Sequence, residues 1–218
     1  MGITQVPDRD ASLIIVGSGF AAAAVVIHLA DNGFAPSDIL IIGPGQLGSG
    51  QAYGCEADAY RLNVRADLQR LWPDHPDHFP QWAKTHIDDP QAKTHAGHFY
   101  RRTDFARYVS AQLEAAAGKK TLRQVPARVV DIRPAQQGWR AICDNGTEYH
   151  SASLLLATGN PEPRWPVANP FEDEATLIRA PWQGEWLTEI DPASHVCLIG
   201  SGLTAMDALY GLAERDHQ

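Results

Sequence analysis

The sequence predicts an α/β fold with a parallel sheet, a small antiparallel β insert and the start of a second, similar unit. Three observations predict it. The aliphatic run 13–16 leads through a Gly-Ser-Gly turn into an apolar helical segment, and a second aliphatic run follows at 39–42. The first pattern then returns at 196–205, which begins 183 positions after residue 13. Repeated strand–helix–strand patterns of this kind favour a parallel, Rossmann-like sheet.

The first glycine turn has the spacing of a nucleotide-binding turn. Residues 13–16 suit a strand buried on both faces, and Phe20–Ala30 suits a helix that Asp31-Asn32-Gly33 ends. In such turns the first glycine permits the tight bend, the second lets a pyrophosphate approach, and a small third residue lets helix and strand pack closely. The predicted pyrophosphate site comprises this turn and the start of the helix: Gly17, Gly19, Phe20, Ala21 and Ala22. The alternative is a strand-to-helix turn that binds nothing.

Composition limits the possible partners. The 218 residues carry a formal net charge of -8 and no basic block, so nucleic acid is not an expected partner. Met1–Ala11 is polar and does not resemble a signal peptide, and no apolar run approaches the ~18 residues that a membrane span needs. Three widely separated cysteines argue against a redox disulfide and a zinc site. We therefore expect a cytoplasmic protein with a small-molecule substrate and no membrane or metal.

The second strand lacks a residue that dinucleotide sites usually have. An Asp or Glu at the tip of this strand commonly binds the ribose, but here Gly43 and Pro44 follow residue 42. The stretch 43–54 then has five glycines in twelve residues, which excludes a regular helix or strand and permits close approach of a ligand to the backbone at Gly50. A flexible loop is the alternative.

The middle of the chain combines a proline- and aspartate-rich stretch with several histidines and a helical segment. Residues 60–82 are predicted to be irregular but docked, because proline and aspartate alternate with large aromatics. Histidines and aspartates between 74 and 98 suggest a metal site, but their spacing matches none, so solvated loop residues are the better interpretation. Arg101 and Arg102 are candidates for contact with a phosphate or for a solvated pair. Thr103 is predicted to cap a helix at 104–117.

Short strands follow that helix. The insert near 122–150 is predicted to contain strands at 127–132, 138–143 and 147–150, with a hairpin turn at Asp144-Asn145-Gly146. Another buried strand, 154–156, ends in a small-residue turn. We expect an FAD-binding domain at 1–160, a crossing segment at 161–190 and an incomplete NAD(P)-binding unit at 191–218; the cofactors in these names come from the resemblance that follows.

Two glycine turns with Ala157-Thr158-Gly159 between them resemble the two-dinucleotide-binding flavoproteins, which include glutathione-reductase-like and flavin-monooxygenase-like enzymes. Within this superfamily the chain is most similar to the bacterial FAD/NAD(P)-binding proteins. The shared features are 48–54, Leu62-Asn63-Val64 with the two residues that follow, Phe79 with Trp82, and 102–108. The resemblance covers nearly the whole chain.

The resemblance implies FAD at the first turn and NAD(P)H at the second. It places Gly17, Gly19 and Ala22 at the FAD pyrophosphate, and Gly43 beside the ribose. It also implies a set of further cofactor-binding residues: Gly50, Leu62, Asn63 and Val64 near the flavin, the Val129 backbone at the adenine, Thr158 and Gly159 flanking FAD, and Gly200, Gly202 and Ala205 at the nicotinamide nucleotide.

Three departures from the family pattern matter. Gly43 replaces the usual acid, and Arg65 stands where the family tends to have proline. The C-terminal Gly-Asp segment that completes the superfamily's FAD domain is also missing, so we expect a truncated member. The strand expected at Val196–Ile199 would need a partner, either the first sheet or another chain in a homo-oligomer.

These features predict an FAD-dependent, NAD(P)H-linked oxidoreductase, or its FAD-binding portion, with an unknown substrate and no assignable catalytic side chain. The absence of a cysteine pair leaves monooxygenase or small-molecule oxidase chemistry open. A non-catalytic FAD-binding module or subunit is the alternative. A single-cofactor NAD dehydrogenase is disfavoured by the missing ribose acid and by the second glycine turn.

Overall fold

The computed structural model describes residues 10–118, 122–161 and 177–215, and these form two compact units. The first unit comprises the described residues up to Tyr53 together with Ala106–Gly159. The second comprises Gly54–Phe105 together with the described residues from Asn160 onward. Much of the crossing segment expected at 161–190 lies outside the described residues.

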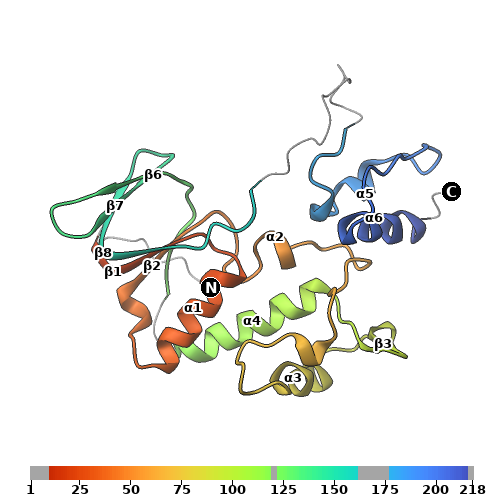
Figure 1. Ribbon diagram of the computed structural model, residues 1–218, viewed down its shortest axis with the longest axis horizontal. Coiled ribbons are helices and arrows are strands. Elements are labelled where there is room, and N and C mark those ends of the chain that lie inside the picture. The colour runs from red at the N-terminus through yellow and green to blue at the C-terminus, as the bar shows by residue number, and fades with distance from the viewer. Residues whose placement is uncertain (1–9, 119–121, 162–176, 216–218) are drawn as a thin grey trace. The chain divides into compact units, whose positions relative to one another are not determined.

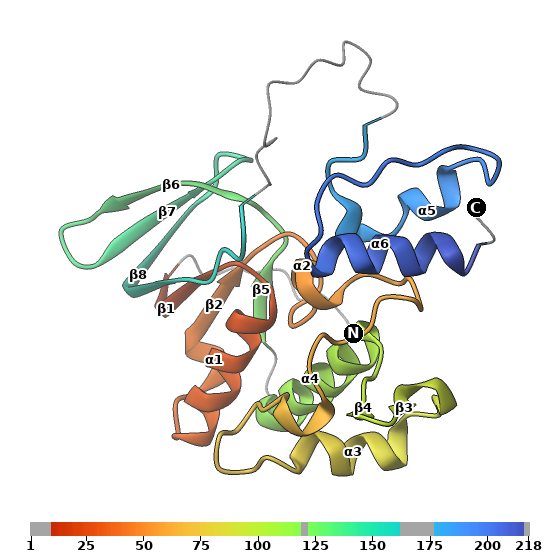
Figure 2. The same ribbon diagram turned by 45° about the vertical axis from the view of Figure 1, so that its right-hand side comes forward.

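The first unit is built on a six-stranded sheet in the order β5-β2-β1-β8-β7-β6 (Figure 1; β5 is labelled in Figure 2). Neighbours from β5 to β8 run parallel, whereas β8, β7 and β6 run antiparallel. The predicted fold class is therefore confirmed. The strands are β1 (Asp10–Val16), β2 (Ile39–Ile42), β5 (Arg123–Val125), β6 (Val129–Pro134), β7 (Trp139–Cys143) and β8 (Glu148–Leu156).

Aliphatic side chains fill both faces of the central strands. All four residues of β2 are buried, as are Ile14, Ile15 and Val16 of β1, which explains the unbroken aliphatic runs in the sequence. The helix α1 (Phe20–Asp31) joins β1 to β2 and buries Val26 and Ile27. A short 3₁₀ turn (Pro36–Asp38) precedes β2, and the one-turn helix α2 (Gly50–Tyr53) follows the glycine-rich loop.

The second unit is mostly short elements and loops. It contains α3 (His78–His86), the two-stranded sheet of β3 (Lys93–Thr94) and β4 (Gly97–His98), α5 (Trp186–Glu189) and α6 (Leu203–Ala213), with 3₁₀ turns at Ala66–Leu68, Pro90–Ala92 and Pro181–Gln183. The helix α4 (Arg102–Ala117) begins in this unit and continues into the first. Figure 2 shows α5 beside α6, and side chains from both helices share one apolar cluster.

Several predicted elements need correction. The stretch 60–82, expected to be irregular, ends in the first half of the helix α3, and Thr103 lies inside α4 instead of capping it. The glycine-rich stretch ends in the short helix α2. The strands expected at 147–150 and 154–156 are one continuous strand, β8, because residues 148–151 pair with β7 and the overlapping stretch 150–156 pairs with β1.

The strand expected at Val196–Ile199 is also a wrong prediction. These residues form no strand within the described parts of the chain, although the helix after them is present as α6. A strand needs a neighbour to satisfy its backbone groups, and no described strand pairs with this segment. Association of two chains through an edge at this position stays a prediction.

Among the helices of the described residues, none has both the length and the apolar character required to cross a membrane.

Burial predicts which sheet residues determine stability. Ile41 of β2 is fully buried, whereas Val130 of β6 is 59% exposed. We expect Ile41→Ala to lower the free energy of unfolding by about 3 kcal/mol, because it leaves a cavity between sheet and helices. Val130→Ala, the matched control, should change it by less than about 0.5 kcal/mol. Thermal and urea unfolding measure both, and equal effects would contradict this description of the core.

Candidate functional site

The first glycine turn lies at the meeting point of three strand ends. Gly17 has a φ of +115°, and its N–H donates to the carbonyl of Ile42 at 2.7 Å. The N–H of Ala157 donates to the carbonyl of Val16 at 2.8 Å. A Cβ atom on Gly17 would lie only 2.1 Å from the Ala157 oxygen. Both the conformation and the space at this position therefore require glycine.

The same crowding explains the missing acid after β2. Gly43 is buried, and its N–H donates to the carbonyl of Val125 at 3.0 Å. A Cβ atom on Gly43 would lie 2.6 Å from the Ser18 nitrogen and 2.8 Å from the Ser18 Oγ. Ser18, the middle residue of the glycine turn, thus occupies the space that the Cβ of an Asp or Glu at position 43 would need. Pro44, the next residue, is exposed.

In contrast, Gly19 faces open space. It is the N-cap of α1, with φ -78° and ψ -170°, and no side chain caps the helix. A Cβ atom here would meet only one neighbour, the Gly50 Cα, at 3.7 Å. The first turn of α1 contains no acidic residue. A helix start with these features presents backbone N–H groups and a positive dipole end to an anion, as a pyrophosphate requires.

The glycine-rich loop folds against this turn. The N–H of Gly48 donates to the Ser18 carbonyl at 2.9 Å, and Gly50, at φ +51°, lies so close that its Cβ would be 2.7 Å from the Gly19 Cα. A Cβ on Gly48 would approach Val109 of α4 at 3.1 Å. The loop is thus packed between the turn and α4, which disfavours the flexible-loop alternative.

The structure brings together most of the residues predicted at the first nucleotide. One end of the first unit's sheet gathers the glycine turn, the start of α1, the tip of β2, the loop and the residues after β8: Gly17, Gly19, Phe20, Ala21, Ala22, Gly43, Pro44, Gly50, Ala157, Thr158 and Gly159. Val129 starts β6 and packs against the cluster that contains Ile42. The remaining predicted residues, Leu62, Asn63, Val64, Gly200, Gly202 and Ala205, belong to the second unit.

The segment expected near the flavin is anchored by its backbone. The N–H of Leu62 donates to the Tyr100 carbonyl at 2.9 Å, and the N–H of Arg102 donates to the Tyr60 carbonyl at 3.0 Å. Leu62 is buried, whereas Asn63 and Val64 are exposed. The polar side chain of Asn63 and the apolar side chain of Val64 therefore lie at the surface of their unit, on a backbone that these hydrogen bonds hold in place.

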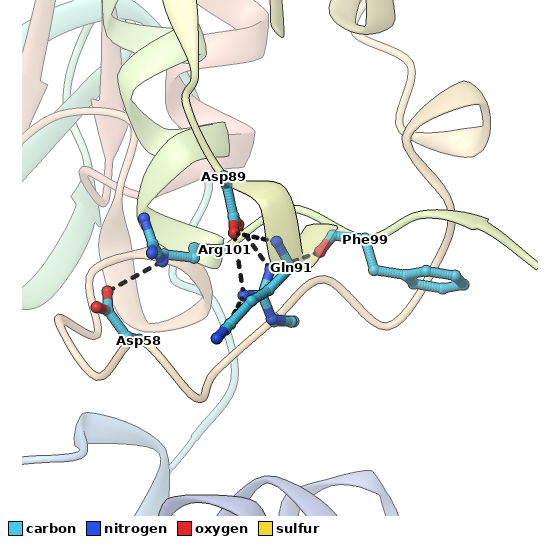
Figure 3. A network of polar contacts seen from close by, with 6 residues as sticks. Asp58, Asp89, Gln91, Phe99 and Arg101 are labelled. Carbon is cyan, nitrogen blue, oxygen red and sulfur yellow. Dashed lines mark hydrogen bonds and ion pairs between the residues drawn. The ribbon is translucent and has the colours of Figure 1, made fainter. Parts of the chain in front are cut away.

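A partly buried ion pair secures this segment (Figure 3). The Arg61 guanidinium donates to both carboxylate oxygens of Asp89, at 2.7 and 3.3 Å, and to the Phe99 carbonyl at 2.9 Å. A further contact runs to the Gln91 side chain at 3.2 Å. The Asp89 side chain is only 1% exposed. Burial opposes its ionisation, but the Arg61 contacts and the charge of Arg101 outweigh burial and hold the pKa of Asp89 below its usual value.

Sequence reasoning missed this pair, since the two residues are 28 positions apart and no pattern links them. Arg101 and Arg102, considered as phosphate ligands, instead form ion pairs within the second unit. Arg101 contacts Asp58 at 3.1 Å, and Arg102 pairs with Asp207 of α6.

The second glycine turn has nearly the same backbone as the first. Gly200 has φ +128°, and Gly202 caps α6 with φ -80° and ψ -179°, again without a side-chain cap. A Cβ atom on Gly202 would meet nothing within 4 Å. The helix behind this turn is held by an apolar cluster that joins Ala208 and Leu212 to α5 and to the 55–60 segment.

The titratable groups beneath α6 are unsuited to proton transfer. Burial raises the pKa of Tyr60 to about 12, and its hydroxyl donates to the Pro181 carbonyl at 2.6 Å. Burial also raises the pKa of the Cys55 thiol, which disfavours the reactive thiolate. Within the described ranges, no three His, Cys, Asp or Glu side chains are grouped so as to hold a metal ion. His78 and His86 instead pack against Trp72 and Trp82.

Comparison with known proteins yields one family match. The family model described as FAD-NAD(P)-binding matches residues 14–161. No curated protein gives a significant match.

Among solved structures, the chain is similar to OTEMO in complex with FAD and NADP (18% identity, TM-score 0.50), covering 74% of this chain and 28% of that one. It is also similar to a flavin-containing monooxygenase from Stenotrophomonas maltophilia (14% identity, TM-score 0.46; 68% and 38% covered). A third is the atypical thioredoxin reductase TRi from Desulfovibrio vulgaris Hildenborough (16%, 0.44; 73% and 39%). The chain thus spans between a quarter and two fifths of the length of these proteins.

The geometry of the first turn predicts different costs for two glycine substitutions. Gly33 has φ +84° and open space around it, so Gly33→Ala should cost about 1 kcal/mol of unfolding free energy through conformation alone. Gly17→Ala adds the overlap with Ala157 and should cost at least about 3 kcal/mol. Chemical denaturation of the two variants measures the difference. Similar costs would show that β1 and β8 can separate without loss of stability.

The Arg61–Asp89 pair predicts a pH-dependent stability. Asp89→Asn should lower the free energy of unfolding at pH 7 by about 3 kcal/mol, since it leaves the guanidinium poorly compensated. Because the folded-state pKa of Asp89 is depressed, its stabilising contribution exists above the unfolded value of about 3.9 and is lost as the pH falls through the folded value.

The difference between wild type and Asp89→Asn should therefore shrink in acid. Asp88→Asn is the matched control, because Asp88 is adjacent and exposed, and it should have little effect at either pH. Denaturation at pH 7 and at a series of pH values descending from 4 measures both variants. A difference that stays constant across this range would contradict the role given to Asp89.

Proposed function

Because the chain belongs to the FAD-NAD(P)-binding family, we propose that it is the FAD-binding portion of an FAD-dependent, NAD(P)H-linked oxidoreductase. One observation carries the proposal: Gly19 leaves the uncapped start of α1 open, while Gly17 and Gly43 are enclosed by backbone. On one side, the turn packs so closely against other backbone that only glycine fits. On the other side, its backbone is open to a pyrophosphate.

The first unit would hold the FAD. The start of α1 would bind the pyrophosphate, the tip of β2 would lie beside the ribose, and the backbone of Val129 would meet the adenine. Thr158 and Gly159 would flank the cofactor. When bound, FAD supplies the isoalloxazine ring that accepts and returns electrons, and the protein contributes position and electrostatics.

The second glycine turn would serve the nicotinamide nucleotide. The backbone angles of Gly202 reproduce those of Gly19 within about 10°, which supports a second phosphate site at the start of α6. We therefore propose that 191–218 begins an NAD(P)-binding unit, with Gly200, Gly202 and Ala205 at the nucleotide. The substrate and the catalytic side chains are not assigned.

We also propose a cytoplasmic location and a small-molecule substrate. The support for the location is the state of the cysteines: Cys55, Cys143 and Cys197 are free thiols, and Cys197 is exposed. Free exposed thiols suit a reducing compartment.

The test is a titration of the purified chain with FAD, followed by flavin absorbance and fluorescence. We expect saturable binding, and Gly19→Ala should weaken it by at least tenfold, because the added methyl group occupies the space of the pyrophosphate. The free energy of unfolding without FAD should stay within about 0.5 kcal/mol, since nothing lies closer than 3.7 Å to that methyl group.

Gly202→Ala is the matched control, because the two glycines share φ, ψ and an open surrounding. It should leave FAD affinity unchanged. A chain that does not take up FAD would refute the proposal, and so would equal losses in the two variants. Oxidation of NADPH by the FAD-loaded chain would support the oxidoreductase, whereas FAD binding without turnover would favour the non-catalytic module.

A further inference from the structure

We propose that Gln124 replaces the missing acid as the side chain that binds the adenosine ribose, an inference that rests on the proposed FAD site. Gln124 lies on β5, which pairs with β2 so that Gln124 stands opposite Ile41. The neighbouring strand therefore brings a polar side chain to the tip of β2, the position from which an acid usually reaches the ribose.

The contacts of the Gln124 amide place it at that tip. Its Nε2 donates to the Gly45 carbonyl at 2.7 Å and to the Gly43 carbonyl at 3.4 Å. Gly43 is the residue at the usual position of the acid, and Ser18 prevents any side chain there. A side chain that reaches the same place must therefore come from another element, and Gln124 does so from β5.

The same contacts determine which atom faces a ligand. Carbonyl oxygens only accept hydrogen bonds, so the nitrogen of the amide must face Gly43 and Gly45. The amide oxygen, Oε1, is left as an acceptor, and within the described residues no donor is directed to it. A ribose hydroxyl is a donor. It would donate to Oε1 of the amide as it donates to a carboxylate oxygen where an acid is present.

The local chain favours this role. Gly45, whose carbonyl accepts from the Gln124 amide, has φ +111°, and nothing lies within 4 Å of the place where its Cβ would be. Gln124 is half-buried, and its backbone is held at the edge of the sheet by the pairing of β5 with β2. The amide is thus both positioned and accessible.

The experiment compares ADP with 2′,3′-dideoxy-ADP as competitors that displace FAD from the chain. Wild type should prefer ADP by about fivefold to tenfold, the effect of one hydrogen bond. In Gln124→Ala the preference should fall below about twofold, because dideoxy-ADP keeps its affinity while ADP loses the contact. Gln137→Ala, on the exposed end of the β insert, is the control and should keep the wild-type preference.

The comparison separates a ribose contact from a purely structural role. If Gln124 only supports the 43–45 loop, both nucleotides weaken equally and the preference persists, which would overturn the inference. Failure of ADP to displace bound FAD would also overturn it. Gln124→Met, of similar size, replaces the alanine variant if that variant unfolds. Absence of FAD binding in wild type would instead refute the proposed function itself.

Discussion

The ends of β1, β2 and β8 approach one another so closely that backbone fills the space between them. Gly17 donates to the end of β2 and would collide with Ala157 after β8 if it carried a side chain. This contact sets where α1 begins, because the N-cap of the helix, Gly19, lies only two residues beyond Gly17. The direction of the helix N–H groups, and hence the proposed pyrophosphate site, depends on it.

Glycine performs two different physical tasks in this site. At Gly17 and Gly43 it permits contact between backbone segments that a Cβ would push apart. At Gly19 and Gly202 it leaves a helix start uncovered: a Cβ atom would meet only the Gly50 Cα, at 3.7 Å, in the first case and nothing within 4 Å in the second. The first task concerns stability and the second concerns a ligand. The close contact at Gly43 also explains why the ribose acid is absent and why a neighbouring strand is the place to search for its replacement.

The second unit relies on polar contacts to order an irregular chain. Tyr60 and Trp186 both donate to the Pro181 carbonyl, at 2.6 and 2.8 Å, and so join two segments that are distant in sequence. Arg61 with Asp89 and Arg102 with Asp207 add two ion pairs of low exposure. In such a pair, the attraction between the two charges is set against the cost of removing both from water. The large loss of stability therefore comes when one partner is removed and the other charge remains without a counter-ion. Their geometry holds the 60–64 segment and α6 in defined conformations.

The sequence by itself determined the elements whose signals are local. Aliphatic runs predicted β1 and β2, the apolar helix with its glycine stop predicted α1, and Asn145-Gly146 predicted the hairpin turn between β7 and β8. The two glycine turns and the resemblance they carry predicted the family. Spacing along the chain was sufficient for these, because each depends on residues within a few positions of one another.

Only the tertiary structure decided the rest. The nine-residue α3 was missed because the proline- and aspartate-rich sequence that leads into it, and Pro80 within it, are typical of loops, yet Phe79 is buried and packs against Phe105. Val196–Ile199 has the composition of a strand but forms none, since a strand depends on partners supplied from elsewhere. The steric exclusion at Gly43 and the arrival of Gln124 beside it arise from pairing between distant segments. Sequence spacing reports local periodicity, whereas these contacts are created when the sheet assembles.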